Sequence, residues 1–516
     1  MALAVFTAGM TTLAVELAAA RLLGNVFGAS NLVWANIIGL ILLYLTAGYF
    51  IGGRWADRSP HPRTFFMLLT WAAFTAGLVP LVARPVLQFA AQAVANFDAA
   101  VMGGSFFAVL ILFSAPITLL GCVSPFAIRL SLTDARRAGQ VAGQQYAIST
   151  LGSLVGTFLP TLWLIPAIGT LRTFLVFAGL LMAVALVGLW GVDRRRALLS
   201  LWMPLLLAAL TAFALAGPLK PVTNAGDTLL TERESEYNFI QVVESGGTRY
   251  LLLNEGQGIH SMYNPDRPAT FGTWDYFLAA PFFNAPGQRA SDVESLALVG
   301  LAAGTIAKQY TQVYGAIPID GIEIDPGIVE VGREYFDMNE PNLNVIVQDG
   351  RWALAHSERQ YSVIGVDAYR LPYIPWHLTT REFFQEARDH LTEDGVLVIN
   401  VGRTHEDRRL IDAMVGTLAS VFPSVYVVDV PNTFNSILYA TLQPTLAGNL
   451  ADNLALMGDA THPLLRQATA MAAENLKPTP DSAVVFTDDL APVEQLTNSI
   501  VIRFILGGSI YQLDTQ

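Results

Sequence analysis

Three acidic side chains stand at the ends of predicted strands in the second half of the chain. Glu323, Asp349 and Asp367 each follow a short apolar run. The carboxyl ends of parallel strands meet at one edge of a sheet, so we expect the three carboxylates to converge on one crevice. Any one of them alone would more often be a helix N-cap or a turn residue. Their recurrence on three strands favours a binding site.

A glycine-rich turn precedes these acids. The apolar run that ends at Val299 is followed by Gly300, Ala302 and Gly304, then by a helical segment and a second apolar run that ends at Glu323. Small residues let a ligand approach the backbone closely, and an acid roughly 20 positions further on binds ribose hydroxyls in nucleotide-binding units. Glu323 lies 19 positions after Gly304. The stretch therefore predicts a βαβ unit with a nucleoside site.

Charge is distributed unevenly along the 516 residues. Up to Leu198 there are 12 arginines, no lysine and 5 acidic residues, a net charge of +7, which leaves −19 for the rest of a chain whose total is −12. An acidic domain argues against a nucleic-acid partner, because phosphate binding needs clustered Lys and Arg. The single cysteine, Cys122, excludes a disulfide framework, and without CxxC or HExxH motifs we expect no metal.

The first part of the chain predicts a multi-pass membrane domain. Stretches apolar over the roughly 20 residues that a bilayer crossing needs lie near 3–25, 31–52, 65–83, 102–124, 146–168, 170–191 and 199–217. Residues 85–101 have a mixed character that suggests an interfacial helix. Arginines fill the second, fourth and sixth loops, which makes these loops cytoplasmic by the positive-inside rule. If 199–217 also crosses, the soluble part emerges on the opposite side.

The remaining chain predicts a soluble α/β region. Short alternating runs around a Gly-Gly turn suggest a small antiparallel subdomain, and alternating strands and helices after it imply a mostly parallel sheet covered on both faces. Four parts follow: a membrane domain at 1–220, a β subdomain at 221–288, a Rossmann-like nucleoside-binding domain at 289–445 and a helical extension at 446–516.

Five motifs occur in order between about 235 and 442. They are SEYN ending at Asn238, LLLNEGQ, the GLAAG loop, the acids Glu323 and Asp325, and the pair Asp349 and Gly350, with Asp367 after the next strand. In this order they resemble the spermidine synthase, or polyamine aminopropyltransferase, family. With the preceding spans the chain is similar to the bacterial membrane-fused members labelled MFS/spermidine synthase.

The resemblance implies roles for these residues. Asn238, the glycine loop, Glu323, Asp325, Asp349 and Gly350 would bind the nucleoside, and Asp367 falls on the catalytic aspartate. The substrate would be S-adenosylmethionine or its decarboxylated form, with no permanently bound cofactor. An amine would attack the carbon next to sulfur, and methylthioadenosine would leave. A carboxylate near the attacking nitrogen can accept its proton or hold it in line.

The chain also departs from the family pattern. Ala303 replaces the aspartate of the glycine loop, Trp274-Asp275-Tyr276 aligns with a tyrosine-histidine-glutamate stretch, and a second aspartate after Asp367 is missing. Each lost carboxylate would weaken binding of a diamine. One alternative is therefore cyclisation or lysis of intact S-adenosylmethionine, giving azetidine-2-carboxylate or a lactone. A methyltransferase, and a transporter or sensor with a degenerate enzyme domain, are further alternatives.

A second set of residues could line an acceptor pocket or a lid. These are His260, Asp275, Tyr276, Tyr369, His377 and Asp489. His260 is equally explained as a turn residue, and Asp489 as part of an acidic first helical turn. As partners we expect a sulfonium nucleoside, an amine, the lipid bilayer and, as an option, a second copy in a homodimer. The expected location is the bacterial inner membrane, with the catalytic domain in the cytosol.

Overall fold

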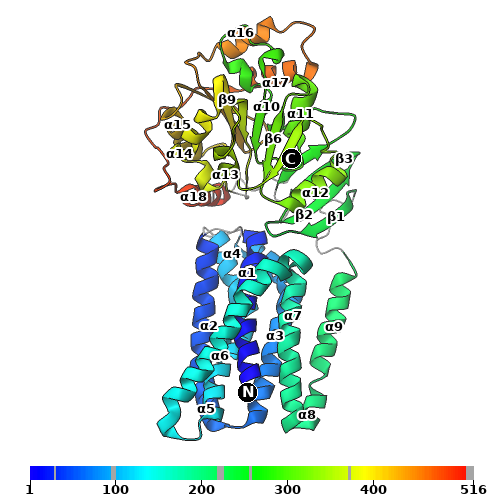
Figure 1. The fold of residues 1–516 in the computed structure, drawn as a ribbon, viewed down its shortest axis with the longest axis vertical. Helices are drawn as coiled ribbons and strands as arrows, with labels where there is room; N and C mark the ends of the chain where they lie inside the picture. The colour runs from blue at the N-terminus through cyan, green and yellow to red at the C-terminus, as the bar shows by residue number, and fades with distance from the viewer. Residues whose placement is uncertain (28–30, 95–99, 218–225, 255–257, 370–372, 507–516) are drawn as a thin grey trace. The chain divides into compact units, whose positions relative to one another are not determined.

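The computed structural model describes residues 1–27, 31–94, 100–217, 226–254, 258–369 and 373–506. It divides into two compact units (Figure 1). The first comprises Met1–Pro221 with Glu234–Glu236, and the second comprises Val222–Arg233 with Tyr237–Gln516. The division falls close to the change from arginine-rich apolar sequence to acidic sequence.

The first unit is built from helices. They are α1 (Ala2–Phe27), α2 (Asn31–Arg58), α3 (Pro62–Val94), α4 (Ala100–Gly121), α5 (Val123–Ser131), α6 (Ala138–Leu159), α7 (Ile165–Val192), α8 (Arg194–Leu199) and α9 (Trp202–Leu215). Within the described residues, six stretches are long and apolar enough to cross a membrane. The fifth, Ala135–Val192, has 58 residues and holds two of the seven predicted spans. These two meet near Gly169, whose φ of 81° interrupts the helical backbone.

The predicted interfacial helix is not a separate element over its described part. Residues up to Val94 continue α3, which contains Pro80 and Pro85. Residues 95–99 lie outside the described part of the chain. Mixed polarity alone did not indicate that the helix runs on past Pro85.

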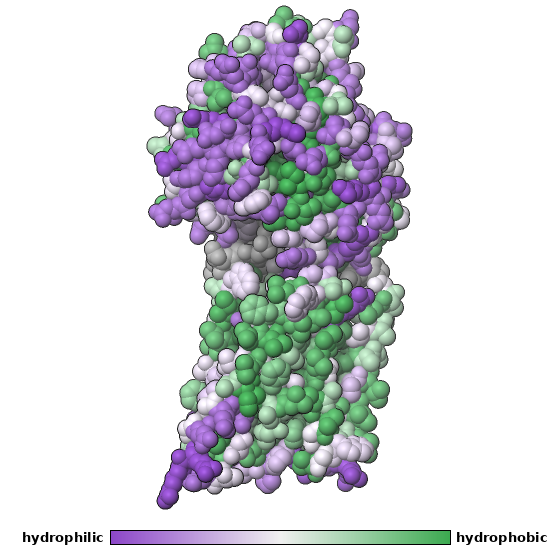
Figure 2. Space-filling model, in the orientation of Figure 1, coloured by the Kyte–Doolittle hydropathy of each residue, from purple (hydrophilic) through white to green (hydrophobic). Residues whose placement is uncertain are grey.

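Close backbone contact joins α1 and α6. Gly152 and Gly156 lie four residues apart on α6, and a Cβ at either would come within 2.0 Å of a carbonyl oxygen of α1. Small residues at this spacing are a common means of packing two apolar helices. Large apolar side chains, such as Phe50, Val187 and Phe213, remain exposed on the unit. Figure 2 shows an extensive hydrophobic surface over these helices, in contrast to the mainly hydrophilic second unit.

The second unit contains two sheets. The smaller has the order β1-β2-β3-β4, from β1 (Thr228–Glu234), β2 (Phe239–Ser245), β3 (Thr248–Leu253) and β4 (Ile259–Tyr263). The larger has the order β12-β10-β11-β9-β8-β5-β6-β7. Its strands are β5 (Leu296–Val299), β6 (Ile319–Glu323), β7 (Leu343–Val347), β8 (Tyr361–Val366), β9 (Leu391–Gly402), β10 (Ser424–Asp429), β11 (Asn435–Thr441) and β12 (Leu476–Lys477).

The central strands of the large sheet are parallel. β9, β8, β5, β6 and β7 pair in parallel, whereas β10, β11 and β12 join by antiparallel pairing. Alternate residues of β5 enter different cores: Leu296 and Leu298 lie in one, Ala297 and Val299 in the other. Both faces of the sheet are therefore covered, as the sequence predicts.

Helices supply both covering layers (Figure 1). They are α10 (Thr273–Phe277), α11 (Thr305–Tyr314), α12 (Pro326–Tyr335), α13 (Gly350–Ala355), α14 (Arg381–Asp389), α15 (Arg409–Ala419), α16 (Asn449–Leu456), α17 (Pro463–Glu474) and α18 (Val493–Leu506). The small sheet packs its apolar face on α12. The predicted helical extension is only partly helical, because β12 pairs with β10 and extends the sheet.

Candidate functional site

The site lies where the order of the parallel strands reverses direction. β5 has β6 on one side and β8 on the other, which is the switch point at which open α/β sheets bind ligands beyond their carboxyl ends. Gly300 follows β5 with a φ of 94°, and a Cβ there would lie 2.5 Å from the carbonyl oxygen of Asp367. The Asp367 amide donates to the Val299 carbonyl at 2.9 Å. Only glycine allows this close contact between the two strand ends.

Glu323 is the buried acid at the end of β6, and it is bonded to the glycine loop. Its two oxygens accept hydrogen bonds from the backbone amides of Ala302 at 2.9 Å and Asp325 at 3.1 Å, and the residue is 8% exposed. Burial raises the pKa of its carboxyl from 4.5 to about 7, because the charged form loses hydration. The acid that ends the predicted βαβ unit is thus bonded to its glycine loop, and binding of ribose by Glu323 stays a prediction.

Asp325 and Asn238 connect the small sheet to the end of β6. Asp325 caps α12 by accepting from the Gly327 amide at 2.9 Å, and it also accepts from Nδ2 of Asn238 at 2.9 Å. Oδ1 of Asn238 in turn accepts from Nδ2 of Asn254 at 3.1 Å. Asp325 is therefore the N-cap of α12, and its side chain also holds a residue of the SEYN motif.

Asp349 likewise has a structural role as a cap. It accepts from the Trp352 amide at 3.0 Å at the start of α13, while its second oxygen lies 3.2 Å from Nε2 of His377. The next residue, Gly350, packs tightly on β5, since a Cβ there would lie 2.5 Å from a methyl carbon of Val299. Glu323 and Asp367 lie beside the glycine loop through their contacts with Ala302 and Gly300, whereas the side chain of Asp349 binds the start of α13 and His377. Convergence of the three carboxylates on one crevice stays a prediction.

Asp367 is held by two neutral donors. Nε1 of Trp274 donates to Oδ2 at 3.1 Å, and Nδ2 of Asn400 donates to Oδ1 at 2.9 Å. Asn400 is fixed in turn, because Nδ2 of Asn435 donates to its Oδ1 at 2.8 Å. An indole N–H can only donate, so Asp367 must accept on that oxygen. Burial raises the pKa of Asp367, and the two hydrogen bonds oppose that effect.

Two candidates of the predicted acceptor pocket bind interior partners instead. Asp275 is fully buried and accepts from the backbone amides of Thr270 and Phe271 at 3.0 and 2.9 Å and from Nε2 of Gln309 at 2.6 Å. The buried phenol of Tyr276, whose pKa burial raises to about 12, interacts with the side chain of Asn475. The partners found for both groups among the described residues are interior ones, and a role of either residue toward an acceptor amine stays a prediction.

The remaining candidates are scattered. Tyr369 donates to the Asn400 carbonyl at 3.1 Å beside Asp367, whereas residues 370–372 lie outside the described residues. Burial lowers the pKa of His260 to about 4, so its ring is neutral near pH 7, and its Nε2 finds no hydrogen-bond partner among the residues that the structure describes. Asp489 is exposed, and its neighbour Asp488 binds Arg351 at 2.7 Å.

No group of three or more metal-ligating side chains occurs in the described ranges.

Sequence reasoning missed the residues that position Asp367. Trp274 entered only as a departure from a motif, and Asn400 and Asn435 did not enter at all. A signal for Asn400 was available: it is a polar residue that directly follows the apolar run 396–399 near the carboxyl end of β9, where the switch-point rule places ligands. Nothing local to Asn435 distinguishes it from a turn residue.

Comparison with known proteins defines the class. Residues 304–448 match the model of the spermine/spermidine synthase domain. A probable polyamine aminopropyl transferase of Bifidobacterium longum is 35% identical over 288 residues, covering 52% of this chain and 62% of that protein. A polyamine aminopropyltransferase of Vibrio vulnificus is 30% identical over 224 residues, covering 41% of this chain and 71% of that protein. The chain belongs to the spermine/spermidine synthase family.

A more distant likeness extends to another enzyme class. The human eEF1A lysine and N-terminal methyltransferase is 27% identical over 163 residues, covering 29% of this chain and 23% of that protein. The chain thus spans less than two thirds of the length of the Bifidobacterium protein and a smaller part of the methyltransferase.

Proposed function

We propose that this chain is an integral membrane enzyme that transfers an alkyl group from a sulfonium nucleoside to an amine and releases methylthioadenosine. The observation that carries the proposal is the carboxyl of Asp367, which Trp274 and Asn400 fix by hydrogen bonds, on a residue whose backbone packs against Gly300 of the glycine loop. The same loop donates a backbone amide to Glu323, the acid expected to bind ribose. Family membership supports the same reaction type.

The chemistry needs few groups. The nitrogen lone pair attacks the carbon next to the sulfonium, the carbon–sulfur bond breaks, and its electron pair neutralises the sulfur. The nitrogen becomes cationic and gives up a proton. A carboxylate with a raised pKa is a better proton acceptor than an ordinary aspartate, so the burial of Asp367 suits it to this role. The two donors fix its orientation, which places the nitrogen in line.

Intact S-adenosylmethionine reacting with its own amine is the second candidate. A diamine would lack the acids that the family pattern provides. Ala303 replaces the aspartate of the glycine loop, Tyr276 stands in place of a glutamate, and the carboxylate of Asp275 is bonded to interior partners. Attack of the α-amine on the γ-carbon would close a four-membered ring and release the same methylthioadenosine. A lyase or lactone-forming outcome would use the same leaving group.

Membrane insertion is part of the proposal. Six apolar helical stretches of 22 to 58 residues and exposed side chains such as Phe50 and Phe213 would be costly in water. We place the catalytic domain in the cytosol, where sulfonium nucleosides are made. Of two reporter proteins fused to the C-terminus, the one that is active only in the cytosol should show activity, and the one that is active only outside the cytosol should not. Extraction of the chain from membranes by alkaline carbonate would contradict insertion.

Product analysis tests the function. The purified full-length protein in detergent is incubated with S-adenosylmethionine or its decarboxylated form, each with and without putrescine, and the products are identified by mass spectrometry. Methylthioadenosine formed only with an amine supports transfer, and methylthioadenosine formed from S-adenosylmethionine alone supports the self-reaction. S-adenosylhomocysteine would instead identify a methyltransferase, and no product under any condition would favour a transporter or sensor.

A matched pair of variants tests the catalytic assignment. Asp367→Asn should reduce product formation at least a hundredfold, because the amide cannot accept the proton. Asp481→Asn changes an exposed aspartate in the same way and should leave the rate unchanged. Full activity in the Asp367→Asn protein would refute the assignment.

A further inference from the structure

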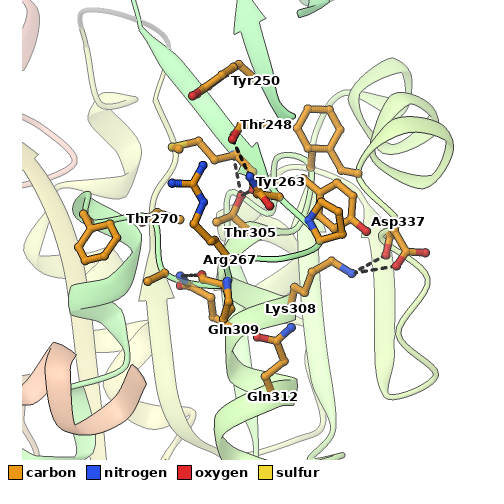
Figure 3. A pocket seen from close by; sticks show the side chains of 18 residues that line it. Thr248, Tyr250, Tyr263, Arg267, Thr270, Thr305, Lys308, Gln309, Gln312 and Asp337 are labelled. Carbon is orange, nitrogen blue, oxygen red and sulfur yellow. Dashed lines mark hydrogen bonds and ion pairs between the residues drawn. The ribbon is translucent and has the colours of Figure 1, made fainter. Parts of the chain in front are cut away.

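A cavity of about 310 Å³ opens beside the glycine loop, at a place where no substrate has been assigned. Its walls come from β3 and β4, residues 264–271, the first two turns of α11 and residues 336–337. Figure 3 shows these segments converging, with side chains of Tyr250, Tyr263, Arg267 and Lys308 around the space. The cavity is thus formed by the small sheet and the Rossmann-like domain together.

The rim of this cavity is held in an unfavourable backbone conformation. Phe271 and Asp337 line it with φ angles of 56° and 51°, and Phe271 is 66% exposed. A bulky side chain in the left-handed region is rare, and such residues cluster at ligand-binding sites. The buried carboxylate of Asp275 maintains this conformation, because it accepts from the amides of Thr270 and Phe271.

Two basic side chains, Lys308 and Arg267, line the cavity. Lys308 forms ion pairs with Glu340 and Asp337. The guanidinium of Arg267 has no acidic partner among the residues that the structure describes, and Figure 3 shows it among the lining side chains. A guanidinium binds a carboxylate through two parallel hydrogen bonds, whereas it repels an ammonium group. The lining therefore favours a carboxylate over a diamine.

Ala303 connects this cavity to the nucleoside site. Ala303 is part of the cavity wall, and its amide donates to Oγ of Ser261 at 2.9 Å. The preceding residue, Ala302, donates its amide to Glu323. The glycine loop therefore supplies one residue to the wall of the cavity and the preceding residue to the contact with Glu323, so the cavity and the proposed nucleoside site are neighbours along the loop. The methyl side chain of Ala303 adds no negative charge there.

We propose that this cavity binds the carboxylate of a substrate through Arg267. The inference rests on the proposed function and narrows it: the reacting molecules include a carboxylate, either that of intact S-adenosylmethionine or that of an amino-acid acceptor. A diamine such as putrescine is then a poor substrate. The two sources share one chemistry, and binding and kinetic measurements distinguish them.

Calorimetry on the full-length protein in detergent tests the first source. S-adenosylmethionine should bind at least tenfold more tightly than its decarboxylated form. Arg267→Ala should remove that difference, because a charge-assisted hydrogen bond contributes roughly a tenfold effect or more. Methylthioadenosine, which lacks the tail, should bind both proteins equally. Arg388→Ala serves as the control, because it removes another exposed arginine, whose ion pair is with its chain neighbour Asp389.

Kinetics test the second source. If the carboxylate belongs to an acceptor, both sulfonium forms should bind alike, and Arg267→Ala should raise the KM of amino-acid acceptors at least tenfold without raising that of putrescine. If Arg267→Ala changes neither the calorimetric nor the kinetic result, or if putrescine has a lower KM than any amino acid, the carboxylate site is refuted while the proposed function still stands. If methylthioadenosine fails to bind the unaltered protein, the proposed function falls and the inference with it.

Discussion

The buried acid Glu323, at the end of β6, makes both the stability of the fold and the binding of a nucleoside depend on pH. Burial raises the pKa of Glu323 from 4.5 to about 7. Between these two values the folded chain keeps a proton that the unfolded chain has lost. The free energy of unfolding therefore falls as pH rises through this window and levels off above pH 7. The shift corresponds to about 3 kcal/mol.

Binding of a nucleoside should also depend on the protonation of Glu323. In the proposed site, ribose hydroxyls would donate to the carboxylate form of Glu323, so that binding would lower its pKa and release a proton. If the pKa returns to 4.5 in the complex, the affinity for methylthioadenosine should rise about tenfold between pH 6 and pH 8. Above pH 8 the affinity should become constant.

Calorimetry in two buffers of different ionisation enthalpy measures both the affinity and the proton released. Glu323→Gln cannot ionise, so its weaker affinity should be independent of pH. Glu358→Gln changes an exposed glutamate and should retain the unaltered profile. An affinity of the unaltered protein that is constant from pH 6 to pH 8, with no proton released, would refute the assignment of Glu323 to the ribose.

Four further predictions concern the support of the site. Trp274→Phe removes one hydrogen bond to Asp367 and should lower kcat about tenfold with little change in nucleoside affinity, measured by product formation and calorimetry. Asn400→Asp places a second carboxyl beside Asp367, so the acid limb of the pH–rate profile should move to higher pH; an unmoved limb would argue against contact. Gly300→Ala should lower the free energy of unfolding by about 2 kcal/mol or more in denaturant titrations, because φ and the neighbouring carbonyl exclude a Cβ. Asp275→Ala should lower the free energy of unfolding by about 3 kcal/mol, since it leaves several buried donors unpaired, and an unchanged thermal midpoint would contradict this.

The sequence was sufficient for the elements that depend on local pattern. The strand ends at Val299 and Glu323 and the glycine loop between them follow from apolar runs and small residues, and the structure has them there. Hydrogen bonds between distant segments were not accessible in the same way. Asp275 looked like a ligand because it aligns with a binding motif, yet its partners, Thr270, Phe271 and Gln309, make it a buried structural acid.

Sequence spacing also could not distinguish the two uses of a strand-end aspartate. Asp325 and Asp349 cap helices, whereas Asp367 does not and is held by side chains 93 and 33 residues away in the chain. The difference depends on which strands become neighbours. Only the pairing of β8 with β9, and of β9 with β11, brings Asn400 and Asn435 within reach.

The link from Asn435 to Asn400 has a practical consequence for protein engineering. Asn435 belongs to the antiparallel margin of the sheet, which a minimal Rossmann fragment would omit. A soluble truncation ending before β11 would leave the Asn400 amide free to rotate and would release the carboxyl that it orients. Recombinant fragments intended for enzymology should therefore extend at least through Thr441.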